Sequence, residues 1–265
     1  MRAFYYVHTG HRIGLDRFRR ASAIIKSLGD VDITLLCSDF RIAQIARDYG
    51  VEKSVGIDVV RNIPQISHHG DKLVFDSEEA NPIMLQDMKD YFSTFIHIKN
   101  DEIFVDETYF EKEEKTIELS YFFGDDDYEK DLEKNLDFIK GLNPDLQLGF
   151  YYFLDYEEML KEKFENYHEF EDYENMIKKT KVLITASPQA VLESLASGGK
   201  PIYFQRKDYT EDFVEVFEKL NIPIIKDYDK DKLSNVLNTI DTHKYVDIRQ
   251  MSNKITPLIR DSLYL

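Results

Sequence analysis

The sequence predicts an α/β fold with two halves, each built from strands that alternate with helices. Short apolar runs alternate with helical patterns through the first hundred residues, which is typical of a parallel sheet covered by helices. A weakly patterned, acidic stretch follows at 102–115, and a clear strand pattern resumes at residue 117. The 265 residues and the 43% hydrophobic content suffice for two modest domains with a buried core. We therefore place the division between the halves near residue 115.

In the first half, apolar runs and helical spacing mark the elements in order. The segment after the first strand carries Leu15, Phe18 and Leu28 on one helical face. Asn81 and Pro82 suit the start of the last helix of this half. The expected strands are 4–7, 33–37, 54–57, 72–75 and 94–97, and the expected helices are 15–28, 41–49 and 81–91.

The second half repeats the alternation with more helix. Gly124 and the three Asp residues after it end the first strand of this half. Charged residues dominate 157–179, which is expected to be mostly a solvated helical surface. Outside 181–204, the expected strands are 117–123, 146–152 and 223–225, and the expected helices are 128–141, 156–164, 173–179, 210–220, 231–240 and 244–263.

Residues 181–204 carry the most informative pattern, namely strand, polar turn, helix, Gly pair and strand. Ser187 and Pro188 suit the N-cap and the first helical position, and Gly198 and Gly199 end the helix. Backbone N–H groups at the start of such a helix point out of the carboxyl end of the sheet, where the helix dipole favours a phosphate or diphosphate. Any strand-to-helix crossover has the same parts, so an ordinary structural crossover stays open.

Charge and cysteine content exclude several classes of function. The formal net charge of −16 argues against electrostatic binding to nucleic acid or to an anionic membrane surface. The single cysteine, Cys37, excludes an intramolecular disulfide and a multi-cysteine zinc site. The sequence has no apolar run of about 18 residues, and a polar residue comes too early in its first ten residues for a secretory signal. We expect a cytoplasmic protein without an integral membrane segment.

The stretch 172–204 resembles the C-terminal nucleotide-binding half of the GT-B-like superfamily, especially UDP-sugar hydrolases of pseudaminic acid biosynthesis and MurG-type glycosyltransferases. The resemblance implies that the turn at 186–190, with Ser187, Gln189 and Ala190, faces the diphosphate, and that Glu193 holds the ribose hydroxyls. The turn in these families is usually rich in Gly. Here Pro188 removes one N–H donor, although that loss is small at the first helical position.

The loop after the first strand is similar to the catalytic loop of the same hydrolases. In its sequence IGLDRFRR, Gly14 matches the first family glycine and Arg20 matches the family arginine. The family histidine, which is thought to serve the attacking water, falls at Arg17. This difference matters because a guanidinium with a pKa above about 12 cannot accept a proton near neutrality.

Three hypotheses for this loop follow. His11, with an unperturbed pKa near 6.5, replaces the missing base. Alternatively, Asp16 takes a proton from an acceptor hydroxyl while Arg17 and Arg20 steady the leaving diphosphate, which would make the protein a transferase. In the third, the protein binds a nucleotide sugar without turnover. A purely structural interpretation also stands, in which Asp16 caps the helix and the arginines are solvated.

Two further segments are expected near the ligand. Gly124 matches a loop that lies over the nucleotide in the resembling hydrolases, and Arg206 is expected to offset phosphate charge. Three carboxylates at 125–127 cannot face a diphosphate without a cation, because like charges about 4 Å apart repel by roughly 1 to 4 kcal/mol. We expect these side chains to point away, with one Asp capping a helix at Tyr128. The superfamily generally needs no bound metal, so no metal and no cofactor is expected.

The resemblance implies a GT-B-like protein of two Rossmann-like halves whose parallel sheets face a central cleft. Residues 1–115 would form the acceptor or catalytic half, and residues 116–265 the nucleotide-sugar-binding half. The expected function is cleavage of the anomeric C–O bond of a UDP-sugar, with transfer to an acceptor hydroxyl or to water, in surface glycan biosynthesis. One alternative is a noncatalytic nucleotide-sugar-binding protein on a degenerate scaffold. Another is a doubly wound domain that binds a different kind of ligand. The oligomeric state is not predicted.

Overall fold

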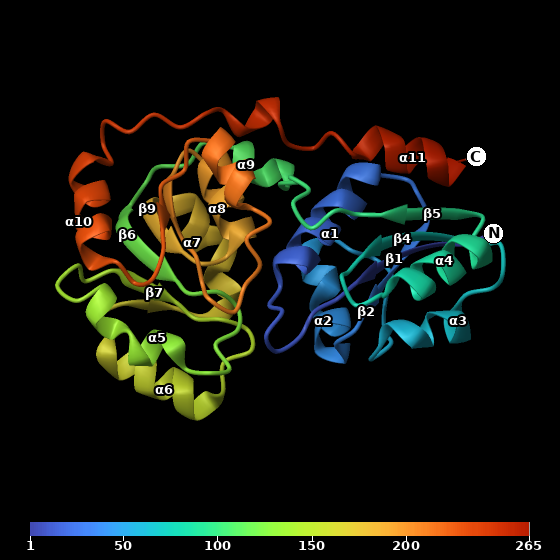
Figure 1. The fold of residues 1–265 in the computed structure, drawn as a ribbon, viewed down its shortest axis with the longest axis horizontal. Helices are drawn as coiled ribbons and strands as arrows, with labels where there is room; N and C mark the ends of the chain where they lie inside the picture. Colours follow the sequence, from blue (N-terminus) through green and yellow to red (C-terminus); the bar gives the residue numbers. More distant parts are fainter. Residues whose placement is uncertain (265) are drawn as a thin grey trace. The chain divides into compact units, whose positions relative to one another are not determined.

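Each of two units of the chain is built around one parallel β-sheet in the computed structural model, which describes residues 1–264 (Figure 1). Unit 1 contains residues 1–106 and the chain from Met251 onward, and unit 2 contains residues 107–250. The chain thus leaves unit 1 about nine residues before the expected division and returns to it near its end. Among the described residues, no helix combines the length and the apolar character needed to cross a membrane.

The sheet of unit 1 has five strands in the order β3-β2-β1-β4-β5. Every neighbouring pair is parallel, so the carboxyl ends of the strands lie at one edge. The strands are β1 (Ala3–Val7), β2 (Ile33–Cys37), β3 (Ser54–Gly56), β4 (Lys72–Asp76) and β5 (Thr94–His97). The helices are α1 (Asp16–Leu28), α2 (Phe40–Ile45), α3 (Ile63–Ile66), α4 (Pro82–Tyr91) and α11 (Thr256–Tyr264).

Side-chain alternation along these strands produces two buried faces. Phe4 and Tyr6 of β1 and Phe75 of β4 lie on one face, in a cluster that includes Ile63 of α3 and packs against Met84 of α4. The residues between them point to the opposite face, where α1 packs (Figure 1). The sheet is therefore covered on both sides, as parallel sheets require.

The returning chain is joined to unit 1 by hydrogen bonds, most of them between a side chain and the backbone. Asn253 donates from its backbone N–H to Ile103 O at 3.1 Å, and its side-chain amide exchanges two bonds of 2.9 Å with the backbone of Val105. The Lys72 ammonium, almost fully buried, donates to Leu263 O at 2.8 Å near the end of α11. These contacts make residues 251–264 an integral part of unit 1.

The sheet of unit 2 has six strands in the order β11-β10-β9-β6-β7-β8, again all parallel. The strands are β6 (Ile117–Phe122), β7 (Asp145–Gln147), β8 (Tyr167–His168), β9 (Thr180–Thr185), β10 (Lys200–Phe204) and β11 (Ile224–Ile225). The helices are α5 (Asp131–Lys134), α6 (Leu154–Lys163), α7 (Tyr173–Lys179), α8 (Pro188–Ala196), α9 (Val214–Lys219) and α10 (Lys230–Thr239).

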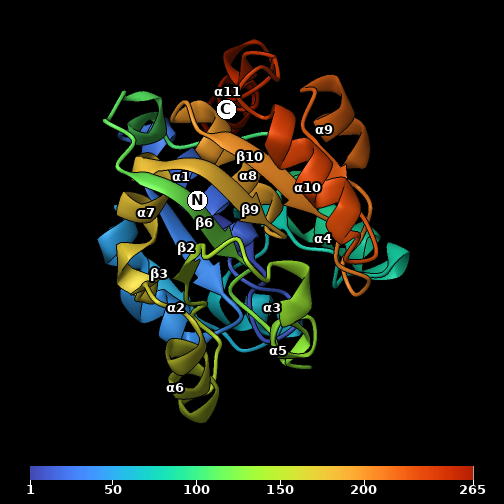
Figure 2. The same ribbon diagram turned by 90° about the vertical axis from the view of Figure 1, so that its left-hand side faces the viewer.

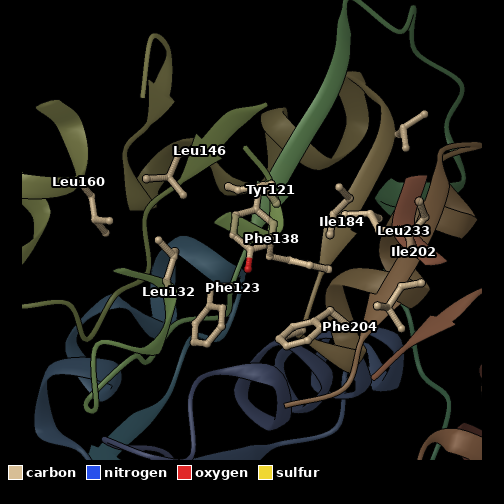
Figure 3. Close-up of a cluster of buried hydrophobic side chains, with 14 of the residues drawn as sticks. Tyr121, Phe123, Leu132, Phe138, Leu146, Leu160, Ile184, Ile202, Phe204 and Leu233 are labelled. Carbon is tan, nitrogen blue, oxygen red and sulfur yellow. The ribbon is translucent and has the colours of Figure 1, made fainter. Parts of the chain in front are cut away.

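One face of this sheet holds the main aromatic and aliphatic cluster of unit 2 (Figure 3). Phe123 follows β6 and Phe204 ends β10, the two strands that flank β9. The Phe138 ring contacts the Phe204 ring in a tilted arrangement with centroids 5.1 Å apart. Helices α5, α6 and α10 contribute Leu132, Leu160 and Leu233 to the same cluster. Helices α7 and α8 pack on the other face (Figure 2). The expected α/β class with parallel sheets is confirmed.

Most expected elements are confirmed, and four segments are corrected. The helix expected at 128–141 is confined to α5, because Lys130 has a left-handed backbone with φ +56° and the helix already ends at Asn135. The strand at 146–152 is only β7, and the helical surface at 157–179 is interrupted by β8, which pairs with β7. The helix expected at 244–263 is confined to α11. Asn253 interrupts it, because its backbone has φ +59° and its N–H donates to Ile103 O.

Candidate functional site

Helix α8 begins just after the carboxyl end of β9, as the sequence predicted. Ser187 is the N-cap, its Oγ accepts the Ala190 N–H at 3.1 Å, and Pro188 occupies the first helical position. The Ser187 N–H donates to Thr185 Oγ1 at 3.1 Å. Two amides of the turn thus bond to side-chain oxygens of the protein, while the Ser187 hydroxyl can both accept and donate. The helix dipole still makes this end favourable for an anion.

Glu193 of α8 is buried and held by two donors. Tyr173, the first residue of α7, donates its hydroxyl to Glu193 Oε2 at 2.6 Å, and Gln189 donates from Nε2 to Oε1 at 2.9 Å. The Tyr173 ring also contacts Phe122, the last residue of β6, with centroids 5.4 Å apart. The carboxylate is therefore fixed close to the carboxyl edge of the unit 2 sheet.

Arg206 links the loop that follows β6 to the loop that follows β10. Its guanidinium lies 4.4 Å from the Phe123 ring centroid and 4.3 Å from that of Tyr209. It donates to Asp126 O at 2.6 Å and forms two bonds with the Asp208 carboxylate at 2.6 and 2.9 Å. With its side chain only 3% exposed, Arg206 acts inside the protein and shapes the loops.

Gly124 and Gly149 allow these loops to approach each other closely. Gly124 has φ +123°, a conformation that L side chains rarely adopt. A Cβ at Gly149 would lie 2.5 Å from Gly124 O, so only glycine fits there. Gly124 thus serves the loop geometry through its backbone.

The three aspartates after Gly124 are all buried, and Asp127 has the capping role that we expected for one of them. It accepts the Asp131 and Leu132 N–H groups at 2.8 and 3.0 Å and the Tyr156 hydroxyl at 2.5 Å. The helix begins at Asp131, three residues after the expected position. Burial raises the pKa of the Asp127 carboxyl, and these hydrogen bonds oppose the shift. Within residues 1–264, no group of three His, Cys, Asp or Glu side chains is arranged to hold a metal ion.

A second polar cluster lies at the carboxyl edge of the unit 1 sheet. His8 follows β1 and Glu79 follows β4, and His8 Nδ1 lies 3.6 Å from Glu79 Oε2. Tyr6 donates its hydroxyl to the same oxygen, and Ser77 Oγ donates to it at 3.1 Å. Burial lowers the pKa of His8 below its usual 6.5, the Glu79 carboxylate opposes this shift, and the Arg17 charge adds to it. The imidazole is therefore neutral at pH 7 and can accept a proton.

The arginines of α1 have different environments. Arg20 is buried and bonds to both oxygens of Asp76, at 2.5 and 3.1 Å, and to the carbonyl of Asn100 at 2.7 Å. Arg17 is partly exposed and donates to Asn100 Oδ1 at 2.8 Å. Arg20 therefore orders the loop around Asn100 from inside unit 1, and any effect of Arg20 on a ligand is indirect.

The other residues expected in this loop are placed as follows. Gly10 and Gly14 form an isolated bridge that closes a tight turn, and His11 lies exposed in that turn. Asp16 is the first residue of α1 and lies 3.8 Å from Arg19 Nη1. Leu15 occupies the N-cap position, so Asp16 is not the cap.

Sequence reasoning missed Glu79 as a partner of His8 and Tyr173 as a partner of Glu193. The sequence contained only a partial signal for Glu79: it follows a predicted strand, and the carboxyl ends of parallel strands lie at one edge of a sheet. That β4 lies next to β1 is decided by the fold. The position of Tyr173 depends on how far α7 runs back along the sheet, which spacing does not determine.

No protein-family model matches the chain, and no curated protein matches it in sequence. Solved structures do match. The UDP-GlcNAc 2-epimerase of Methanocaldococcus jannaschii, in complex with UDP-GlcNAc and UDP, is 11% identical with a TM-score of 0.62 over 100% of both chains. MurG of Acinetobacter baumannii is 12% identical with a TM-score of 0.53, over 99% of both chains. The E. coli heptosyltransferase WaaC with ADP is 9% identical with a TM-score of 0.51, over 92% of this chain and 99% of WaaC.

At these identities the similarity shows the fold. The chain has the GT-B-like architecture of two Rossmann-like units that the resemblance in its sequence predicted.

Proposed function

We propose that this protein uses a nucleotide sugar, cleaving the anomeric C–O bond of a UDP-sugar and passing the glycosyl group to an acceptor hydroxyl or to water. The observation that carries the proposal is the arrangement of α8 in unit 2. Its capped start and its Glu193 carboxylate lie within two helical turns of each other at the carboxyl edge of a parallel sheet. The epimerase and WaaC, which share the fold, were solved with UDP and ADP respectively.

Each unit has a proposed part in this function. In unit 2, Ser187, Gln189 and Ala190 face the diphosphate at the start of α8, and Glu193 accepts the ribose hydroxyls. Arg206 and Gly124 hold the adjoining loop in shape. The resemblance further suggests a setting in surface glycan synthesis.

Unit 1 supplies the proton acceptor in this proposal. The acceptor or water oxygen bonds to the anomeric carbon, the bond to the diphosphate breaks with its electron pair, and the proton of the nucleophile passes to a base. His8 suits this role because it is neutral at pH 7 and faces the Glu79 carboxylate, which stabilises the imidazolium once it forms. His11 and Asp16 remain proposed bases, with Gly14, Arg17 and Arg20 ordering the loop around them.

Calorimetric titration with UDP and ADP, followed by product analysis with a panel of UDP-sugars, tests the proposal. UDP is expected to bind more tightly than ADP, and Glu193→Ala is expected to weaken UDP binding. Release of free sugar indicates hydrolysis, and release only with an added acceptor indicates transfer. UDP binding without any sugar release would favour the noncatalytic binder. No binding of either nucleotide would overturn the proposal.

A further inference from the structure

We propose that a cavity at the C-terminal end of α8 binds a small carboxylate that carries an apolar ring. The cavity has a volume of about 250 Å³, and all of its lining residues belong to unit 2. None of them belongs to the candidate functional site, which lies at the other end of the same helix. The inference therefore does not depend on the nucleotide-sugar reaction.

Three segments that are distant in sequence form this cavity. One is the segment at 110–112, where the chain has just entered unit 2, and another is the segment at 245–249, where the chain is about to leave it. The third is the end of α8 with Gly198 after it. The short helices η3 (Glu107–Phe110) and η6 (Ile248–Gln250) of the first two segments both pack on α8. A ligand in the cavity would thus contact both connections and the helix between them.

The wall of the cavity is apolar and only partly covered by the protein. The apolar lining residues that stay partly exposed are Phe110, Leu195, Tyr245 and Val246. The Tyr245 ring is held in place, because its hydroxyl donates to Pro201 O at 3.1 Å. A concave place with an apolar wall and a few charged groups is typical of a small-molecule site.

The charged groups of the lining favour an anion. The Arg249 guanidinium lies over the Phe110 ring, 5.1 Å from its centroid, and Lys112 forms no ion pair with the residues that the structure describes. Asp247 Oδ1 accepts the Arg249 N–H at 3.0 Å, and Oδ2 lies 4.0 Å from Nη1. Two cations and one carboxylate leave a charge of +1 here, in a chain with a net charge of −16. Guanidinium and ammonium donors suit a carboxylate.

The end of α8 opposes an anion only weakly. The helix dipole places partial negative charge at this end. However, the three backbone N–H groups at 197–199 donate to carbonyls of α8, so these carbonyls are already satisfied. The two cations at the cavity counteract the dipole that remains.

The volume of the cavity limits the ligand to a single ring. Sites for drug-sized ligands and cofactors have volumes of about 300 to 1,000 Å³. At about 250 Å³ this cavity is smaller, so it does not suit a nucleotide sugar. One ring with one carboxylate matches the volume, the apolar wall and the two cations.

The test uses benzoate as the probe and benzamide as its uncharged counterpart with the same ring. Ligand-observed NMR titrations are applied to the full chain, Lys112→Gln, Arg249→Gln and Ala196→Trp, with thermal melting to confirm folding. Ala196 lines the cavity, so the indole of Ala196→Trp fills it. Lys244→Gln is the matched control, because it removes an exposed cation next to the lining segment but outside the cavity.

The wild type is expected to bind benzoate about tenfold more tightly than benzamide. Lys112→Gln and Arg249→Gln should each weaken benzoate binding about threefold to tenfold and leave benzamide binding nearly unchanged. Ala196→Trp should abolish binding of both probes, and Lys244→Gln should change neither. If Ala196→Trp does not fold, the two exposed cations decide the question. An excess of UDP should not displace benzoate.

Several results would overturn the inference. Equal binding of the two probes by the wild type, or no binding of benzoate at millimolar concentration, would show that the cavity does not select an anion. Benzoate binding that persists in folded Ala196→Trp would place the ligand elsewhere, and displacement of benzoate by UDP would place it in the candidate nucleotide site. An equal loss of affinity in Lys112→Gln and Lys244→Gln would reduce the effect to general charge.

Discussion

The imidazole of His8 and the carboxylate of Glu79 face each other at the carboxyl edge of the unit 1 sheet, with Nδ1 and Oε2 3.6 Å apart. The two residues are far apart in sequence and come together because β1 and β4 are neighbours in the sheet. The carboxylate counteracts the loss of basicity that burial imposes on His8.

The first prediction concerns the pH dependence of sugar release. Activity should fall as the pH drops through the pKa of His8, which lies below 6.5, because the protonated imidazole cannot accept a proton. Glu79→Gln removes the group that raises this pKa, so the acid limb of the kcat profile should move to lower pH. His8→Gln should lower kcat about 100-fold or more. The control His168→Gln lies in unit 2 and should leave the profile unchanged; an unchanged profile in Glu79→Gln would argue against the dyad.

The second prediction concerns the buried pair of Arg20 and Asp76. Burial disfavours the Arg20 charge, but the Asp76 carboxylate outweighs it and raises the pKa of the guanidinium. Arg20→Met leaves this carboxylate without its cation and should lower the free energy of unfolding by about 3 to 5 kcal/mol in urea titrations. Arg41→Met breaks an exposed pair with Asp39 and should cost less than about 1 kcal/mol. Similar losses in the two variants would contradict a structural role for Arg20.

The third prediction concerns the returning chain. Asn253→Ala removes two hydrogen bonds to the backbone of Val105 and places alanine at φ +59°. We expect a loss of about 2 to 4 kcal/mol in the free energy of unfolding. Asn235→Ala on the exposed surface of α10 is the control and should change stability by less than about 0.5 kcal/mol. Equal melting temperatures for the two variants would show that the return adds nothing to unit 1.

The fourth prediction concerns Lys115, whose ammonium donates to Lys178 O at 2.6 Å and Ser197 Oγ at 3.2 Å. Burial lowers the pKa of Lys115 to about 8, and the Glu113 charge opposes this. Between about 8 and 10.5 the unfolded chain holds a proton that the folded chain has lost, so stability rises with pH in this window. Between these pH values, the free energy of unfolding of the wild type should rise by about 1 to 2 kcal/mol relative to that of Lys115→Met. The rise is smaller than the full pKa shift would give, because Lys115 is partly exposed. If the difference in unfolding free energy between the two proteins stayed constant across this pH range, the prediction would be wrong.

Local sequence patterns predicted much of the fold, including the turn at the start of α8 in the candidate site. Ser187, Pro188 and the apolar run before them predicted β9 and the start of α8, because capping and strand formation depend on adjacent residues. The helix predicted at 128–141 is wrong because its length depends on contacts that are distant in sequence. Asp127 bonds to the start of a short helix only, and Tyr156 of another helix donates to the same carboxylate.

The sequence by itself determined that this chain alternates strands and helices in two halves and begins a helix at an anion-favouring turn, because periodicity, N-caps and glycines act over a few residues. Only the tertiary structure decided that Glu79 meets His8, that Tyr173 and Gln189 hold Glu193, and that Asn253 returns to unit 1. These pairings depend on which strands become neighbours and on where each connecting segment packs. Both are determined by how the whole sheet buries its apolar faces.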